Sequence, residues 1–336
     1  MQKQTPKYNL RENETPKNIH SVYENIDELK LPKWVLEQID EAIVVGNNNR
    51  TIVIPDGRRY YIDNPLNDLS GGEWLKFTSS AFQTRYNTSG SDSYAHSIRK
   101  THPTPKPPQL MKEIIEFFTK ENELVFDYFM GVGGTLLGAS LCNRQAIGID
   151  LNEEYVDVYK KANEHLGLVE QDAFCGDSLS LLENKEFMKS ILVDRKISLV
   201  LLDPPYSNMM SKEKTGADII KYGVSATPFT KFDEDLGNMT KTDFFENLRK
   251  SVELTLPYVK KRGYIVIFIK DIQPSKKNTN LLHAEVIEHI NKIPNVYYKG
   301  LKIWVDLSAK LFPYGYPFSY VSNQIHQYIM IFRKEK

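Results

Sequence analysis

Cysteine is scarce in this 336-residue chain, which carries only Cys142 and Cys175. They form no Cys-x-x-Cys motif and lie near no pair of histidines, so the sequence offers neither a disulfide framework nor a zinc site. No apolar run approaches the roughly 20 residues that span a bilayer, and no basic segment followed by an apolar one opens the chain. We therefore expect a cytoplasmic protein with no metal and no membrane contact.

Net charge is also absent, because 43 lysines and arginines balance 43 aspartates and glutamates. A large positive charge, the simplest sign of nucleic-acid binding, is missing, so a polyanion would have to be held by local patches. The composition, with 41% hydrophobic and 11% aromatic residues, is still that of a folded globular protein.

The N-terminal part of the chain is irregular. Its first 30 residues have few apolar side chains, which predicts a loose arm. A short helix over 32–42 and a hairpin of strands 51–55 and 59–62, joined at Asp56-Gly57, are expected next. We expect residues 1–95 to be an arm with a small accessory region, and residues 96–336 to be the main domain.

Helices and strands alternate from about Leu110 onward, which is typical of a parallel α/β sheet. The expected helices cover 134–142, 153–166 and 240–261, and the expected strands cover 124–127, 145–150, 197–202, 263–270, 301–307 and 326–333. This pattern predicts a doubly wound open sheet of about 6 to 7 strands, in which ligands bind beyond the carboxyl ends of the strands.

A glycine-rich loop follows the first of these strands. Gly131 and Gly133 let the backbone approach a ligand, and the helix that follows offers free N–H groups. A dinucleotide fingerprint would need a third glycine where Leu136 stands, and no P-loop lysine follows, so nicotinamide, flavin and P-loop nucleotide sites are disfavoured. By position this is a cofactor loop, although such turns also serve as plain connections.

Two further strand ends carry acidic residues. Asp150 stands where a carboxylate meets the hydroxyls of a ribose, although it could equally cap the next helix. Asp177, followed by Ser178, could accept a hydrogen bond from an exocyclic amine such as that of adenine. Together with the glycine loop, these residues indicate a nucleoside-bearing cofactor across adjacent strand ends.

The tetrapeptide Asp203-Pro204-Pro205-Tyr206 ends an apolar strand. The prolines fix the backbone and remove N–H donors, which leaves the Pro204 carbonyl beside the Asp203 carboxylate as a second acceptor. An exocyclic amine that donates to both acceptors is drawn toward tetrahedral geometry, and its lone pair becomes available to attack a methyl group. Tyr206 supplies a ring on which an extruded base can stack.

With the elements before it, this tetrapeptide resembles the amino-group DNA methyltransferases of the N6-adenine and N4-cytosine type. The family's loop, Asp-Pro-Phe-x-Gly-Ser-Gly-Thr-Thr, is matched at five positions, whereas Tyr128, Val132 and Gly134 depart from it. The family's upstream His-x-Thr-x-Lys-Pro element is matched by residues 102–107. The resemblance implies a Rossmann-like methyltransferase sheet with an antiparallel C-terminal strand, and S-adenosylmethionine as cofactor. It implies cofactor contacts for Thr104, Lys106, Asp127, Phe129, Gly131, Gly133, Thr135, Asp150, Asp177 and Ser178.

The implied reaction is methylation of the N6 amine of an adenine flipped out of double-stranded DNA, as in restriction-modification systems. Asp203, Pro204, Pro205 and Tyr206 are the expected catalytic residues. An N4-cytosine DNA enzyme, an RNA amino-group enzyme, a glutamine-modifying protein methyltransferase and a non-catalytic subunit remain as alternatives. The sequence also allows a homodimer, or a partner subunit that supplies target recognition.

Three further features suggest contacts with the substrate. Residues 207–239 lack periodicity and are expected to close over the flipped base. Residues 260–262 with Lys270, Lys276 and Lys277 are expected to form a basic strip for phosphates. Alternating aromatics over 312–320 are expected to lie partly in the core and partly in the base pocket.

Overall fold

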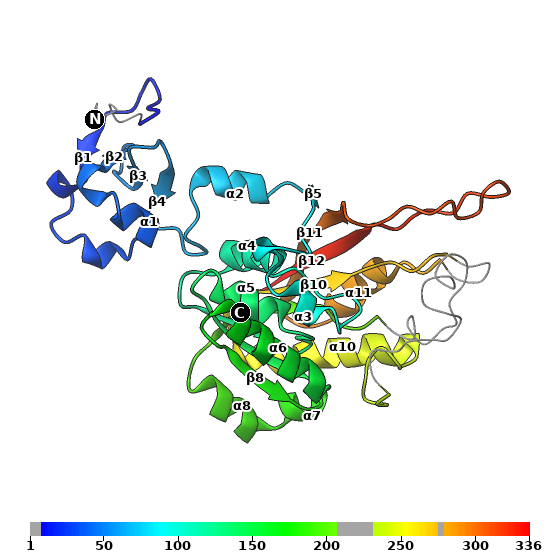
Figure 1. Cartoon of the computed structure of the whole chain (residues 1–336). Helices are drawn as coiled ribbons and strands as arrows, with labels where there is room; N and C mark the ends of the chain where they lie inside the picture. Colours follow the sequence, from blue (N-terminus) through cyan, green and yellow to red (C-terminus); the bar gives the residue numbers. More distant parts are fainter. Residues whose placement is uncertain (1–7, 207–230, 275–278) are drawn as a thin grey trace. The chain divides into compact units, whose positions relative to one another are not determined.

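The structure is a computed structural model that describes residues 8–206, 231–274 and 279–336 (Figure 1). Its contacts divide the chain into two compact units, Met1–Ser79 with Glu116–Glu121 and Ser80–Ile115 with Asn122–Lys336. The sequence places the boundary after residue 95. Residues 80–95 instead join the second unit, because Ala81–Thr84 adds a strand to its sheet.

The first unit contains a small antiparallel sheet of four strands in the order β1-β2-β3-β4. These are β1 (Lys17–Asn18), β2 (Ile43–Val45), β3 (Thr51–Val53) and β4 (Arg59–Tyr61). The β3–β4 hairpin confirms the sequence prediction. The predicted helix over 32–42 is shorter, as α1 (Lys33–Leu36) and a 3₁₀ turn (Ile39–Glu41).

The prediction of a loose arm over the first 30 residues is wrong for the second half of that segment. Ile19 is fully buried in the core of the first unit, where it meets Val44, Ile52 and Tyr60. Val22, Tyr23, Ile26 and Leu29 pack against the same core. These apolar residues are few, but they are spaced so that one side of the segment is covered, which a composition average does not detect. A helix, α2 (Gly71–Phe77), follows and carries a capping box between Ser70 and Glu73.

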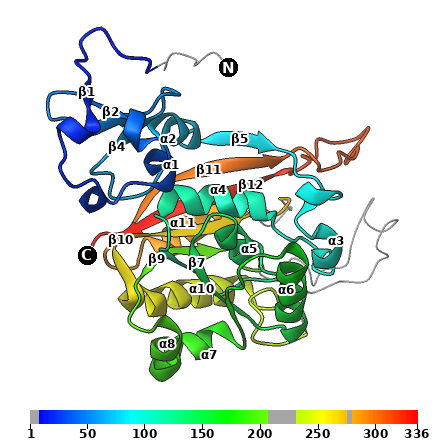
Figure 2. The same cartoon turned by 60° about the vertical axis from the view of Figure 1, so that its left-hand side comes forward.

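The second unit is built on a sheet of eight strands in the order β5-β11-β12-β10-β9-β6-β7-β8 (Figure 2). The strands from β10 to β8 are mutually parallel, and β12 is antiparallel to both of its neighbours. The predicted antiparallel C-terminal strand is thereby confirmed, and β5 accounts for the additional strand. The bounds are β5 (Ala81–Thr84), β6 (Leu124–Asp127), β7 (Gln145–Asp150), β8 (Asp172–Cys175), β9 (Ile197–Leu202), β10 (Val259–Ile269), β11 (Val296–Asp306) and β12 (His326–Lys334).

Helices cover both faces of this sheet. One face packs against α7 (Ser178–Glu183), α8 (Lys185–Leu192), α10 (Lys241–Thr255) and α11 (Leu282–Ile290) in a single core that includes Ile147 and Ile149 of β7. Gly148, between these two, faces the other side, where a Cβ would lie 2.8 Å from Leu136 of α5 (Gly134–Ser140). The remaining helices are α3 (His96–Arg99), α4 (Pro108–Phe118) and α6 (Glu153–Leu166). Doubly wound packing is the arrangement that the sequence predicts.

Candidate active site

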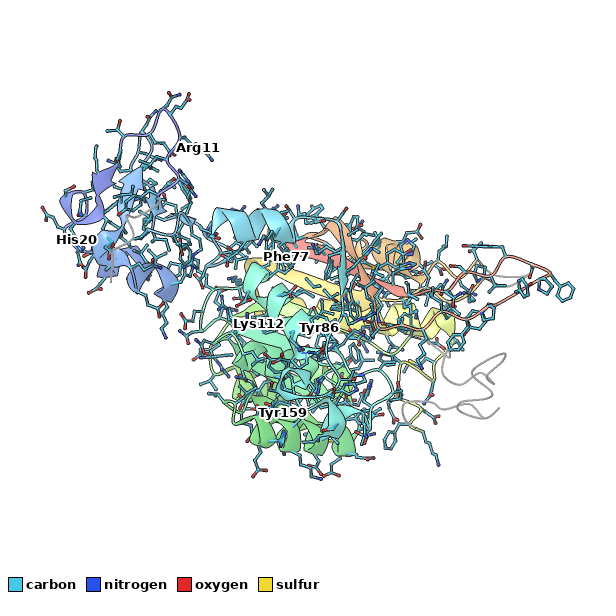
Figure 3. The ribbon with its side chains drawn as sticks, turned by 45° about the horizontal axis from the view of Figure 1, so that its top comes forward. Arg11, His20, Phe77, Tyr86, Lys112 and Tyr159 are labelled. Carbon is cyan, nitrogen blue, oxygen red and sulfur yellow. The ribbon has the colours of Figure 1, made fainter. Side chains whose placement is uncertain are left out.

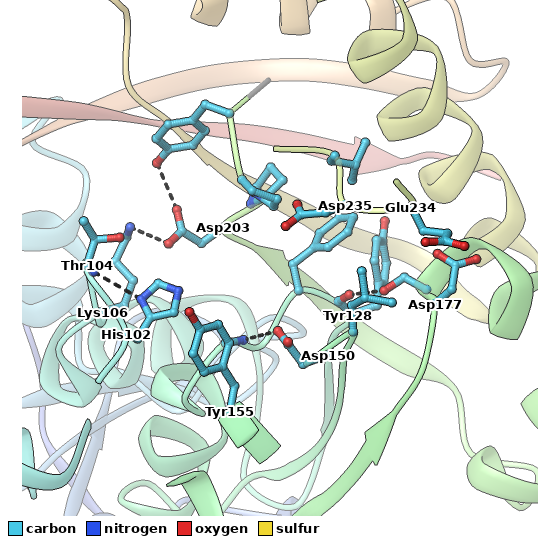
Figure 4. A pocket seen from close by; sticks show the side chains of 18 of the residues that line it. His102, Thr104, Lys106, Tyr128, Asp150, Tyr155, Asp177, Asp203, Glu234 and Asp235 are labelled. Carbon is cyan, nitrogen blue, oxygen red and sulfur yellow. Dashed lines mark hydrogen bonds and ion pairs between the residues drawn. The ribbon is translucent and has the colours of Figure 1, made fainter. Parts of the chain in front are cut away.

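The carboxyl ends of β6, β7, β8 and β9 open onto one cavity of about 200 Å³ (Figure 4). Eleven of the fourteen residues proposed from the sequence line it, although they come from segments a hundred residues apart. Parallel strands end at the same edge of a sheet, and this brings the residues together. They are Thr104, Lys106, Phe129, Gly131, Asp150, Asp177, Ser178, Asp203, Pro204, Pro205 and Tyr206.

Two glycines shape the loop after β6, in different ways. Gly131 has a φ of +52° and donates its N–H to Asp150 Oδ2 at 2.8 Å. Gly133 has a φ of +74°, and a Cβ there would lie 2.2 Å from Cδ2 of Tyr159 on α6 (Figure 3). Gly131 therefore faces the cavity, whereas Gly133 permits close helix packing and is absent from the described lining.

Asp127 and Thr135 lie beneath the loop. Thr135 Oγ1 donates to Asp127 Oδ2 at 2.5 Å, and the Phe129 N–H donates to Asp127 Oδ1 at 3.0 Å. Burial raises the pKa of Asp127 to about 7. Within the described residues, this pair lines a smaller adjoining cavity of about 40 Å³ and not the main one. Its carboxylate oxygens are occupied in fixing the loop.

Asp150 does not cap the helix that follows it. Asn152 caps α6 by accepting from the Glu154 N–H, while Asp150 accepts from the N–H groups of Gly131 and Asn152 at 2.8 and 2.9 Å. Burial raises the pKa of Asp150 to about 6. Each of its oxygens keeps a further lone pair that a ligand hydroxyl can use.

Asp177 and Ser178 lie at the start of α7. Asp177 Oδ2 accepts from the N–H and hydroxyl of Ser180 at 2.8 and 2.6 Å, so it is the N-cap of this helix. Ser178 Oγ donates to the Tyr128 carbonyl at 2.5 Å, which ties α7 to the glycine loop. Both residues line the cavity while they hold these contacts.

Asp203 is fixed from two sides. Lys106 Nζ lies 2.5 Å from Oδ2, and the Tyr206 hydroxyl donates to Oδ1 at 3.0 Å. Burial and the neighbouring carboxylate raise the pKa of Tyr206 well above its usual range, so its hydroxyl stays protonated. Arg99, itself buried, donates to the Lys106 carbonyl at 2.5 Å and so orders the segment that carries the lysine.

The cavity also holds residues that the sequence analysis did not assign. His102 belongs to the matched upstream element, and its pKa is lowered to about 3 by burial and by Lys106, so it is neutral. Its ring packs edge to face against the ring of Tyr155 on α6, with the two ring centroids 4.9 Å apart. Glu234 and Asp235 lie in a stretch without periodicity, so no sequence pattern marks them.

The described residues of the expected basic strip do not gather in one place. Lys260 lies near the start of β10 and pairs with Glu123, whereas Lys270 lies just beyond the end of that strand. An eleven-residue strand separates the two by roughly 30 Å. Lys276, Lys277 and most of 207–239 lie outside the described residues.

The aromatic loop does not complete the pocket either. Tyr316, Phe318 and Tyr320 are 81%, 93% and 92% exposed, and in the described lining of the cavity no residue of 312–320 occurs. They lie in the long connection from β11 to β12, which runs beyond the end of the sheet (Figure 1). Alternation of aromatic residues was therefore not a sign of burial here.

The charges of the cavity favour a ligand with a cationic centre. Carboxylates outnumber lysines among the described lining residues, which include Asp150, Asp177, Asp203, Glu234 and Asp235 against Lys106 and Lys270. S-adenosylmethionine combines a nucleoside with a sulfonium centre. The residues therefore fit this cofactor in charge as well as in their position at the strand ends.

The strand order, the antiparallel β12 and the strand-end acidic groups define a Rossmann-like methyltransferase fold. A family profile described as a DNA methylase, of the N6/N4 type, matches residues 2–161, just under half of the chain. Over this part the chain is similar to the amino-group DNA methyltransferases, whose cofactor is S-adenosylmethionine, and the match supports the sequence prediction of both.

Curated relatives resemble part of the chain. Type II methyltransferase M1.MboII of Moraxella bovis is 33% identical over 133 residues, which cover 40% of this chain and 45% of that protein. Type II methyltransferase M2.LlaDCHI of Lactococcus lactis subsp. cremoris is 34% identical over 104 residues, 31% of this chain and 36% of that protein. The matches thus span less than half the length of these relatives.

Among solved structures, NSun6 from Pyrococcus horikoshii with SFG has a TM-score of 0.42 and 12% identity, over 69% of this chain and 53% of that one. Across the described residues, no helix is long and apolar enough to cross a membrane. The same part of the chain contains no group of three or more histidine, cysteine or acidic side chains placed to hold a metal ion.

Proposed function

We propose that this chain transfers a methyl group from S-adenosylmethionine to the N6 amine of an adenine in double-stranded DNA. One observation carries the proposal: Asp203, fixed by Lys106 and Tyr206, faces the same cavity as the acidic strand ends of β7 and β8. An amine acceptor and a nucleoside site therefore share one enclosure. The bound cofactor supplies an electrophilic methyl group on its sulfonium centre.

The cofactor would lie across the ends of β6, β7 and β8. Asp150 accepts hydrogen bonds from the ribose hydroxyls through its remaining lone pairs, and Asp177 with Ser178 lies toward the adenine. Phe129 and Gly131 form the loop side, and Thr104 with Lys106 lies toward the methionine end. Asp127, Gly133 and Thr135 act as positioning residues, because they hold the loop that the cofactor meets.

The target amine would donate one N–H to Asp203 and the other to the Pro204 carbonyl. Pro205 keeps this turn rigid, and Tyr206 offers its ring to the base. Held between these two acceptors, the amine nitrogen would be aligned to receive the methyl group that the bound cofactor would supply. The amine then loses a proton, and the adjacent Asp203 carboxylate is the group placed to accept it on its way to solvent.

Adenine is the proposed base because Asp at position 203 is associated in this family more often with adenine than with cytosine. Cytosine N4 is the alternative, since both amines present two N–H groups to the same acceptors. We also predict, as the sequence allows, that a second copy of the chain or a partner subunit supplies target recognition.

The decisive experiment incubates the chain with S-adenosylmethionine and unmethylated plasmid DNA, followed by nucleoside mass spectrometry. N6-methyladenine is the expected product. N4-methylcytosine without N6-methyladenine would contradict the base assignment, and parallel reactions with RNA and protein test the other substrate classes.

A further inference from the structure

A second cavity, of about 330 Å³, adjoins the candidate active site on its β10 side. Lys106 and Thr104 line both cavities, and so do Lys270 and Gln327. The remaining wall comes from the segment before α4, including Tyr86, and from the end of β11, including Trp304. This space lies away from the ends of β7 and β8, where the cofactor is placed.

Three of the wall residues form a row across neighbouring strands. The antiparallel ladder pairs Ile269 with Tyr328, so the next step places Lys270 opposite Gln327. Gln327 is in turn paired with Trp304 of β11. Residues opposite each other in adjacent strands point to the same face of a sheet. Lys270, Gln327 and Trp304 therefore present one row of side chains to the second cavity.

Polar groups in this row are left without partners. Gln327 Oε1 is buried and has no hydrogen-bond partner among the described residues. Lys270 forms no ion pair or hydrogen bond with any other described residue; burial together with Lys106 lowers its pKa, and Asp306, which lines the same cavity, acts on it in the opposite direction. Buried polar groups are normally satisfied, so unsatisfied ones at a cavity wall indicate a ligand that completes them.

Resting on the proposed function, we infer that this row is the subsite for the nucleotide that carries the target amine. Lys270 pairs with its backbone phosphate, and the Gln327 amide hydrogen-bonds to the edge of its base. Lysine suits a phosphate as a compact point charge, and an amide can pair with a base edge as both donor and acceptor. Because Lys270 and Gln327 line both cavities, they border the path from the second cavity to Asp203.

Lys270→Met tests the phosphate contact, and Lys261→Met is its matched control, since Lys261 is exposed near the start of the same strand. Binding of a fluorescent DNA duplex is measured by anisotropy at several salt concentrations. Removal of one phosphate contact should make the slope of log affinity against log salt shallower by about 0.9. Slopes equal for the two variants would overturn the assignment of Lys270.

Gln327→Leu tests the base contact, with Gln83→Leu on the exposed side of β5 as control. We expect kcat/KM for plasmid DNA to fall by about tenfold or more for Gln327→Leu, with an unchanged salt slope. Calorimetric affinity for S-adenosylmethionine should match that of the unmodified chain in both variants. A loss of cofactor affinity with unaltered DNA parameters would place the row in the cofactor site and overturn the inference.

Failure of the unmodified chain to methylate DNA would instead contradict the proposed function, while the anisotropy measurement still tests Lys270.

Discussion

Both carboxylate oxygens of Asp203, the proposed acceptor of the target amine, are already oriented, one by Lys106 and one by Tyr206. A preoriented acceptor needs no rearrangement when charge develops on the amine, which is the condition under which electrostatic stabilisation is effective. The ion pair with Lys106 also compensates the negative charge of this partly buried carboxylate. At the scale of single residues, the site therefore combines ordering of the acceptor with stability of the ligand-free protein.

Asp203→Asn should lower kcat by about a hundredfold or more, because the amide replaces one anionic acceptor oxygen with a donor. Affinity for S-adenosylmethionine should fall far less than kcat, since the proposed nucleoside contacts lie on other strand ends and only Lys106, the ion-pair partner of Asp203, is shared with the proposed methionine end. Radiolabelled methyl transfer and calorimetry measure the two quantities. Asp194→Asn, in an exposed turn, is the control. A variant that kept a tenth of the wild-type turnover would contradict the assigned role.

Asp150→Asn should weaken S-adenosylmethionine binding by about 1.5 to 3 kcal/mol, which is roughly tenfold to a hundredfold. The amide retains one acceptor oxygen for the loop, but it loses the charge that strengthens the bonds to the ribose hydroxyls. Isothermal titration calorimetry gives the affinity directly. An affinity equal to that of the unmodified chain would show that Asp150 does not hold the ribose.

Asp127 makes the stability of the ligand-free protein depend on pH. Burial raises its pKa to about 7 from an ordinary value near 3.8, so between these values the folded chain holds a proton that the unfolded chain has released. Its contribution to the free energy of unfolding is fully present below about pH 4 and is lost as pH rises through 7. Asp127→Asn should therefore reduce the fall in melting temperature between pH 5 and pH 8, as measured by thermal unfolding. The exposed Asp157→Asn should leave that fall unchanged.

At the scale of elements, the site depends on how closely α5 and α6 approach the loop after β6. Gly133→Ala should destabilise the protein in two ways, because it combines a left-handed backbone with a Cβ 2.2 Å from Tyr159 Cδ2. Gly167→Ala shares the positive φ of +61° but meets no atom within 4 Å. The control should therefore lose about 1 to 2 kcal/mol, and Gly133→Ala about 1 to 3 kcal/mol more. Urea unfolding measures both, and equal losses would exclude the packing role.

The elements that sequence predicts best are those with a strong local pattern. β6, β7, β9 and α6 begin and end at the predicted residues, since their apolar runs and helical spacing are bounded by polar or glycine residues. β5 and α11 were not predicted. β5 is a strand because β11 offers it a partner, and its half-exposed residues carry no apolar alternation of their own.

The same distinction applies to the site. Asp150, Asp177 and Asp203 could be assigned because each follows a predictable strand, and a parallel sheet brings such positions to one edge. Gln327 lies within an antiparallel strand, and its role depends on a register with β10 and β11 that no local pattern encodes. The prediction of a basic strip was wrong for a related reason. Lys260 and Lys270 are ten positions apart in the sequence, but β10 is extended between them, so they lie far apart in space.

At the scale of the whole molecule, equal numbers of basic and acidic residues must still allow a polyanion to bind. Many lysines and arginines are already paired with carboxylates, as Lys260 is with Glu123 and Arg59 is with Glu14, and such pairs add little to the field at a distance. In our proposal, cations at the substrate side such as Lys270 would then carry the interaction with phosphate.

DNA binding should consequently depend strongly on salt despite the zero net charge of the chain. Each phosphate neutralised by a local cation releases condensed counterions, so log affinity should fall with log salt at a slope of about −3 or steeper if three or more phosphates are contacted. Anisotropy titrations of a duplex between about 50 and 200 mM salt, the range in which this effect is large, measure the slope. Binding of S-adenosylmethionine over the same range is the internal control, because burial shields that site from screening. A flat dependence for DNA would mean that the chain does not hold a nucleic-acid backbone, and the substrate would then have to be sought among proteins.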